Sequence, residues 1–286
     1  MAIDTQAFRL LLAARKAGVD FSRTVTFGRQ SFFPKPRLAS RALVASGLGI
    51  TLAQIGPLRH AYAETFLAAL GASSVDALDA SDYEQAGLVH DLNEPVPAEL
   101  HGRYTCVFDG GTSEHVYDYP ELISNAMRLL AVGGHFISIT SGNNQSGHGF
   151  YQISPELFFR VFSAENGFAI RAVLLAGTRP GGRFYRVADP ALLGHRVEFA
   201  TAHRLHVAVI ARKLEPVDRL RCRPQQSDYR AQWQQSPESA AGRPSRIGRE
   251  LRRLGRQFRG FAGSHCPLSW QCPGITTLND RALYSL

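Results

Sequence analysis

Apolar runs alternate with segments of helical periodicity over the first 213 residues. Runs typical of β-strands occupy residues 22–27, 73–79, 87–92, 104–109, 134–140, 169–177 and 204–213. Strands that alternate with helices predict a parallel sheet with helices on both faces, and near-continuous apolar strands are typical of such buried sheets. The last two runs are predicted to pair as an antiparallel hairpin at one edge. The pattern therefore predicts an α/β, doubly wound, mostly parallel sheet.

Helix signals lie between several of these runs. Residues 119–134 place apolar side chains at helical spacing, and Gly133-Gly134 is predicted to end that helix. Residues 154–168 begin with Ser154 in the N-cap position. The first residues place Asp4 before a short apolar stretch and basic residues after it, which is the reverse of a signal peptide. We therefore expect an amphipathic N-terminal helix and a cytoplasmic protein.

The pattern ends after Lys213, and two domains of unequal order are predicted: a folded domain over residues 1–213 and a largely disordered tail over residues 214–286. The tail is rich in Gln, Ser, Pro and Arg, and much of the net charge of +8 belongs to it. Residues 247–258 form one possible amphipathic helix with a basic face. Such a helix suits an acidic partner or a membrane surface, but a solvated helix packed loosely on the domain is the more common case. Nucleic acid is not a favoured partner, because the arginines lack interleaved aromatic residues for base stacking.

The four cysteines show no spacing typical of zinc ligands, so neither a metal site nor a disulfide framework is predicted. The chain also contains no apolar run near the roughly 20 residues that cross a bilayer.

Candidate binding residues lie just after the predicted strands, because ligands of open parallel sheets bind beyond the carboxyl ends of the strands. An acid after the second strand suits a ribose diol, a polar residue after the third suits an adenine amino group, and glycine after the fourth permits close backbone approach. Each residue has an ordinary alternative role in a turn or cap. The candidates are Gly28, Arg29, Gln30, Asp79, Ala80, Asp91, Leu92, Asp109 and Gly110.

The order of SVDALDAS, VHDLNEPVP, YTCVFDGGTSEHV and NAMRLLAVGGHFISI along the chain resembles the class I S-adenosylmethionine-dependent methyltransferases over roughly residues 22–213. The resemblance implies a Rossmann-like, seven-stranded sheet and S-adenosylmethionine as the cofactor. It implies that Asp79 binds the ribose, that Asp91 and Leu92 contact the adenine, and that Asp109 opens the segment ending in Glu114-His115. The chain departs from the family after the first strand, where GRQ replaces the glycine-rich motif.

Two histidines are candidate catalytic residues for methyl transfer. His115 follows the fourth strand, and His148 lies in a polar loop after the fifth; an imidazole near neutrality can take a proton from an acceptor. Both have a structural alternative, as a cap and as part of a lid. The leading prediction is methyl transfer to a small polar acceptor, which the polar loop suggests is a sugar or glycan intermediate. The alternative is a catalytically degenerate methyltransferase fold that serves as a partner or regulatory module.

Overall fold

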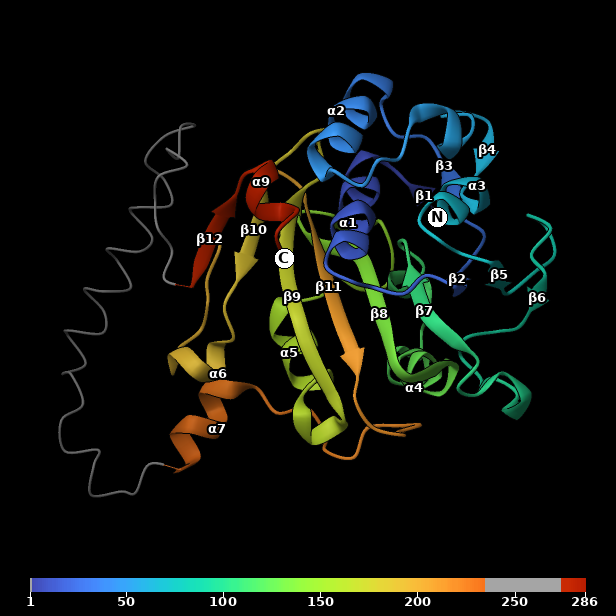
Figure 1. Cartoon of the computed structure of the whole chain (residues 1–286). Helices are drawn as coiled ribbons and strands as arrows, with labels where there is room; N and C mark the ends of the chain where they lie inside the picture. The colour runs from blue at the N-terminus through green and yellow to red at the C-terminus, as the bar shows by residue number, and fades with distance from the viewer. Residues whose placement is uncertain (1, 235–273) are drawn as a thin grey trace.

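The computed structural model describes residues 2–234 and 274–286. Within them, nine strands form one sheet with the order β12 (Ile275–Leu278), β10 (Phe184–Val187), β9 (Phe168–Gly177), β11 (Leu205–Lys213), β8 (Leu130–Asn143), β7 (Tyr104–Asp109), β2 (Arg23–Phe27), β5 (Ser74–Asp79) and β6 (Leu88–Val89). Strands β6, β5, β2, β7 and β8 pair in parallel, and every pair from β8 to β12 is antiparallel. Figure 1 shows this sheet running through the molecule.

Helices cover both faces of the sheet. One face packs against α1 (Thr5–Lys16), α2 (Pro36–Ser46), α3 (Glu64–Ala69) and α9 (Asp280–Leu283), and the other against α4 (Tyr119–Leu129) and α5 (Pro155–Val161). Successive side chains of a strand point to opposite faces of the sheet, which produces two hydrophobic cores. In β7, Cys106 and Phe108 face the first set of helices, and Val107 faces the second. Two further helices, α6 (Pro190–Leu193) and α7 (Ser227–Gln234), follow β10 and β11. None of the described helices is long and apolar enough to cross a membrane.

A second, small sheet lies beside the carboxyl end of β2. It joins β1 (Ala2–Ile3), β3 (Ser31–Phe32) and β4 (Ala61–Tyr62). The amide of Ala63 donates to the carbonyl of Gln30, at 3.0 Å, so the chain leaves the main fold after Gln30 and returns at Ala63. Residues 31–62 therefore form an insertion, and α3 begins directly beside the exit of β2 in space.

The predicted doubly wound α/β sheet is confirmed, with differences in detail. The glycine pair at 133–134 does not end a helix: α4 ends at Leu129, and the glycines lie inside β8. A Cβ on Gly134 would lie 3.0 Å from the carbonyl oxygens of Ala131 and Thr105, so the position serves the close approach of β8 to β7. The pair β9–β11 is antiparallel as predicted, but β10 and β12 extend the sheet beyond it. Helix α1 is buried along most of its length and is not an amphipathic surface helix.

The folded domain does not end at Lys213. Strand β12 pairs with β10, and in the following helix Leu283 and Tyr284 are buried in the core beside α1. Asp280 accepts from the Arg9 guanidinium at 2.6 Å. The prediction of a separate tail is therefore wrong for residues 274–286, while the predicted helix at 247–258 lies outside the described residues.

Candidate functional site

The strand order reverses between β2 and β7, and the predicted site residues lie at this switch point. Phe27, the last residue of β2, pairs with Leu78 on one side and with Asp109 on the other. The exits of β2, β5 and β7 therefore meet at one edge of the sheet, where open α/β sheets bind ligands. The sequence order predicted this convergence.

The side chain of Gln30 covers Gly110 at the switch point. Its amide nitrogen donates to the carbonyls of Phe27 (2.7 Å) and Gly28 (3.2 Å). A Cβ on Gly110 would lie 2.2 Å from the Gln30 Oε1 atom, so only glycine fits beneath this side chain. Gln30 Oε1 is buried and has no hydrogen-bond donor among the described residues. A buried, unpaired acceptor is costly, which makes this atom a candidate contact for a ligand donor.

Arg29 links the exits of β2 and β5 to α3. Its amide donates to Asp79 Oδ2 at 3.3 Å, and its guanidinium donates to Glu64 (2.7 Å) and to the carbonyl of Glu84 (3.0 Å). The same guanidinium lies 3.8 Å from the centre of the Tyr62 ring. Asp79 is half-buried, and its Oδ1 atom has no hydrogen-bond partner among the described residues.

The remaining predicted cofactor contacts differ in exposure. Asp91 is exposed and accepts from the amide and side chain of Asn93, which lowers the pKa of its carboxyl group. This is the capping role that the sequence left open. Leu92 is buried in the core beneath α4, and Ala80 is exposed beyond the end of β5.

Asp109 is fully buried and serves the turn that follows β7. Its carboxylate accepts from the amides of Thr112 (2.9 Å) and Ser113 (3.2 Å) and from the Ser138 hydroxyl (2.7 Å). Burial, and then the nearby charge of Glu114, raise the pKa of this carboxyl group. Asp109 therefore shapes the crevice from inside the protein rather than through an exposed oxygen.

Three side chains converge beyond the exits of β7 and β8: Glu114, His115 and His148, which we call the Glu114 cluster. One potential ligand atom from each lies within 4.8 Å of the other two. Glu114 is buried, whereas both histidines are exposed. His148 Nε2 lies 3.5 Å from Glu114 Oε1, and the two imidazole rings are 5.4 Å apart between centres. The structure thus brings together both predicted catalytic histidines, with a carboxylate beneath them.

Hydroxyl groups of β8 hold the Glu114 carboxylate in place. Thr140 Oγ1 donates to Glu114 Oε2 at 2.6 Å, and Ser141 Oγ donates to Oε1 at 3.2 Å. The Glu114 carbonyl accepts from the amides of Phe150 (2.7 Å) and Tyr151 (3.2 Å), so the loop that carries His148 is docked on the residue below it. A single residue therefore fixes both the carboxylate and the loop.

The sequence interpretation missed His206. It pairs with Ser141 across β8 and β11, and its Nδ1 atom is buried without a hydrogen-bond partner in the described chain. Burial lowers the pKa of His206, and the charges of Asp4 and Glu114 oppose that shift. Because β11 is antiparallel to β8, the first residues of β11 lie at the carboxyl end of β8. The predicted antiparallel pairing of the last strands was therefore the sequence signal that could have placed His206 at this edge.

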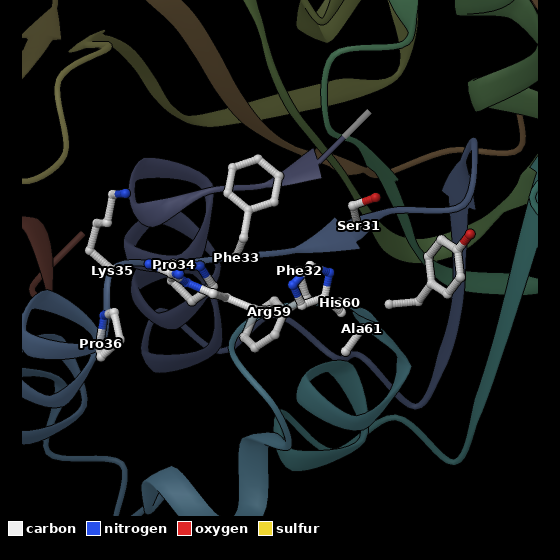
Figure 2. Close-up of a pocket in the computed structure, with 10 residues that line it drawn as sticks. Ser31, Phe32, Phe33, Pro34, Lys35, Pro36, Arg59, His60 and Ala61 are labelled. Atoms are coloured by element: carbon white, nitrogen blue, oxygen red, sulfur yellow. The ribbon is translucent and has the colours of Figure 1, made fainter.

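A cavity of about 630 Å³ lies in the insertion, close to Arg29. Its basic lining residues are Lys35, Arg59 and His60, and none of its described lining residues is acidic. In Figure 2, Phe33 stands between Lys35 on one side and Ser31 on the other. Tyr62, which stacks on Arg29, also lines this cavity. The lining suits an anionic group beside an aromatic surface.

No protein-family model matches the sequence, and no curated protein matches it. Solved structures do match. An S-adenosylmethionine-dependent methyltransferase from Mesorhizobium loti is 16% identical, with 70% of this chain and 96% of that chain covered and a TM-score of 0.37. The 1,6-didemethyltoxoflavin N1-methyltransferase of Burkholderia thailandensis is 13% identical, with 73% and 78% covered and a TM-score of 0.39. The geranyl diphosphate C-methyltransferase of Streptomyces coelicolor A3(2) is also 13% identical, with 73% and 77% covered and a TM-score of 0.39.

The chain has a Rossmann-like, doubly wound α/β fold, and its own strand order carries this assignment. Strands β6, β5, β2, β7 and β8 form the doubly wound parallel part, and the antiparallel β11 lies between β8 and β9. The predicted Rossmann-like sheet is therefore confirmed. The order of the strands also explains why the Glu114 cluster and Asp79 face the same edge.

Proposed function

We propose that this chain is an S-adenosylmethionine-dependent methyltransferase that acts on a small polar acceptor bound at the Glu114 cluster. The observation that supports this proposal most directly is the common position of Asp79, Gly110 and the Glu114 cluster around one switch point. A cofactor and an acceptor bound at that edge would lie next to each other, as a direct transfer between them requires.

Two features of the crevice fit the cofactor. Asp79 Oδ1 lacks a partner and can accept from a ribose hydroxyl, and the buried Gln30 Oε1 can accept from the amino group of the methionine part. The guanidinium of Arg29 is the exception, because it stands across the exit of β5 with three partners of its own.

When bound, S-adenosylmethionine supplies a methyl group on a positively charged sulfur. In this proposal, Asp79 and Gln30 orient the cofactor, and the imidazoles of His115 and His148 contact the polar group of the acceptor. Glu114 positions His148, since its carboxylate is fixed by Thr140 and Ser141. The loop docked on the Glu114 carbonyl keeps bulk water from one side of the acceptor.

Calorimetric titration with S-adenosylhomocysteine tests the proposal. We expect one binding site per chain and at least about a tenfold loss of affinity in Asp79→Ala, since a buried or half-buried hydrogen bond to a charged group contributes about 1.5–3 kcal/mol. Asp91→Ala is the matched control, because that carboxylate serves its own turn. An Asp79→Ala variant that binds as tightly as the parent chain would refute the assigned ribose contact.

A second candidate function is a degenerate fold that acts as a partner or regulatory module without the cofactor. Arg29 favours it, because the guanidinium ties β2 to Glu64 and Tyr62 across the space that a nucleoside would enter. In this case the parent chain would not bind S-adenosylhomocysteine even at millimolar concentration. Binding recovered in Arg29→Ala would then identify the arginine as the obstruction.

Three sequence predictions remain predictions: the sugar or glycan acceptor, the cytoplasmic location, and an acidic partner or membrane surface for the tail. The catalytic roles of His115 and His148 belong to the proposal above.

A further inference from the structure

We infer that the Glu114 cluster binds a divalent transition-metal ion, and that the methyl acceptor is a hydroxyl oxygen that ligates this ion. The ion site rests on the geometry of the three side chains. The identity of the acceptor rests on the proposed function as well.

The spacing of the donor atoms suits one ion. Metal–ligand bonds of about 2.0–2.2 Å put neighbouring donor atoms roughly 3 to 3.5 Å apart. The Glu114 Oε1 and His148 Nε2 atoms are 3.5 Å apart, and all three donor atoms lie within 4.8 Å of one another. His115 and His148 are exposed, so a small side-chain movement would close the remaining gap.

The donor set selects the kind of ion. Two imidazoles and one carboxylate are typical ligands of zinc and of iron, cobalt and manganese, whereas magnesium and calcium prefer oxygen ligands alone. Thr140 and Ser141 supply the outer hydrogen bonds that orient a ligating carboxylate. Such outer hydrogen bonds are a regular part of metal sites in proteins.

The charges around Glu114 also call for a cation. Glu114 is buried beside the fully buried Asp109, so two carboxylates share a poorly hydrated region. Hydroxyl and amide donors satisfy their oxygen atoms but supply no positive charge. Among the described residues, the only basic side chain within 4.0 Å of the Glu114 carboxylate is His148, whose Nε2 atom lies 3.5 Å from Oε1. A divalent ion would offset the cost of burying these charges.

Three protein ligands leave coordination positions open, because zinc-like ions take four to six ligands. The open positions face the solvent side, where His115 and His148 are exposed. A hydroxyl that ligates the ion loses its proton more readily, and the proton passes to water. The oxygen lone pair then forms the C–O bond as the C–S bond of the donor breaks, and the sulfur keeps that electron pair as a neutral thioether.

Cobalt titration of the full chain tests the ion site, since Co²⁺ reports its ligands through its visible absorption. We expect one Co²⁺ per chain, displaced by one equivalent of Zn²⁺, and no displacement by a tenfold excess of Mg²⁺. His148→Ala and Glu114→Gln should each weaken binding at least about tenfold, and Thr140→Val about tenfold or more through the outer hydrogen bond. His203→Ala is the matched control, because that histidine is exposed and lies outside the cluster.

Two results would overturn the ion site: no Co²⁺ binding below millimolar concentration, or a Co²⁺ spectrum unchanged in both His148→Ala and Glu114→Gln. A chain that unfolds in Glu114→Gln is separated from this case by His148→Ala, whose side chain is exposed. Azide tests the open position. A shift of the Co²⁺ bands on adding azide supports an acceptor-binding position, and an unchanged spectrum refutes it.

The same sample separates this inference from the proposed function. Binding of S-adenosylhomocysteine without Co²⁺ binding would leave the methyltransferase proposal and reject the metal. Binding of Co²⁺ without S-adenosylhomocysteine would leave the ion site and reject methyl transfer.

Discussion

The two halves of the carboxyl edge use polar side chains in opposite ways. At the exits of β2 and β5, the guanidinium of Arg29 donates hydrogen bonds to Glu64 and to the Glu84 carbonyl. The amide nitrogen of Gln30 donates to two carbonyls of its own turn. At the exits of β7 and β8, Glu114 is held from below by Thr140 and Ser141, and the histidines above it remain exposed. In the first half, the donor groups of Arg29 and Gln30 are bound by the protein itself, whereas in the second half two exposed histidines lie above a buried carboxylate.

The difference ranks the two halves as candidates for a binding site. The hydrogen bonds and the ring contact of the Arg29 guanidinium stabilise the turn after β2. A buried glutamate next to a buried aspartate gives no comparable benefit, since charges in poorly hydrated surroundings are costly unless paired. Polar groups that are kept together at such a cost are characteristic of functional sites. The β7–β8 half is therefore the better candidate for chemistry.

The largest effect that distinguishes the halves is expected from Gly149→Ala in the β7–β8 half. A Cβ at this position would lie 2.6 Å from the carbonyl oxygen of Glu114, which is backbone and cannot rotate away. We expect a loss of about 3 kcal/mol in the free energy of unfolding, measured by urea denaturation, because forced atoms in a packed contact cost about this much. Cobalt binding should weaken as well, since the docked loop carries His148.

Gly87→Ala is the control for this substitution, because its Cβ would meet no atom within 4 Å and its backbone has no positive φ. Equal stability of the two variants would show that the His148 loop is not docked on Glu114, and the contrast between the halves would lose its basis.

A smaller effect, about 2 kcal/mol, is expected from Gly110→Ala at the exit of β7, where Gln30 of the β2–β5 half covers the glycine. Here the nearest atom, Gln30 Oε1 at 2.2 Å, belongs to a side chain, so the clash can be relieved by a second substitution. In the double variant with Gln30→Ala we expect a favourable coupling of roughly 1 kcal/mol or more in a double-mutant cycle. The relief is partial, because a Phe108 ring atom also lies 2.9 Å from the added Cβ.

Additive effects in this cycle would contradict the assignment of Gln30 as the group that covers the switch point. Improved binding of S-adenosylhomocysteine by Gln30→Ala alone would show that the covering side chain blocks the cofactor rather than contacting it.

The sequence predicted the parts of this edge that follow from local patterns. Apolar runs ending in Asp79 and Asp109 identify two parallel strands, and their order places both carboxyl ends at one edge. The docking of Gln30 on Gly110 could not be predicted, because it depends on the insertion returning at Ala63. The grouping of Glu114, His115 and His148 could not be predicted for a similar reason: His148 comes from a different loop, and hydrogen bonds from that loop to the Glu114 carbonyl bring it near.

The same physical limit applies to the C-terminal residues. Ile275–Leu278 is four residues long and follows a polar stretch, so its pattern alone does not identify a strand. It becomes β12 because β10 offers an unpaired edge, and Arg9 on α1 offers an ion pair to Asp280. Long-range partners of this kind carry no signal in the local sequence.

The smallest effect is expected at the other end of β8, where His135 provides a reference for the histidines of the Glu114 cluster. Burial, followed by the charges of Arg212 and Arg171, lowers the pKa of His135 to about 4. The unfolded chain therefore takes up a proton near pH 6.5 that the folded chain refuses until about pH 4, and stability falls as the pH is lowered through this interval. His135→Gln should remove this contribution.

Urea denaturation at pH 7, 5.5 and 4.5 measures the difference between the parent chain and His135→Gln. One proton changes the free energy of unfolding by at most about 1.4 kcal/mol per pH unit, and partial exposure of the ring reduces the slope below that limit. His203→Gln, at an exposed position, should keep the pH dependence of the parent chain. Parallel pH profiles for the parent chain and His135→Gln would mean that burial of His135 beside the two arginines does not make the free energy of unfolding depend on pH.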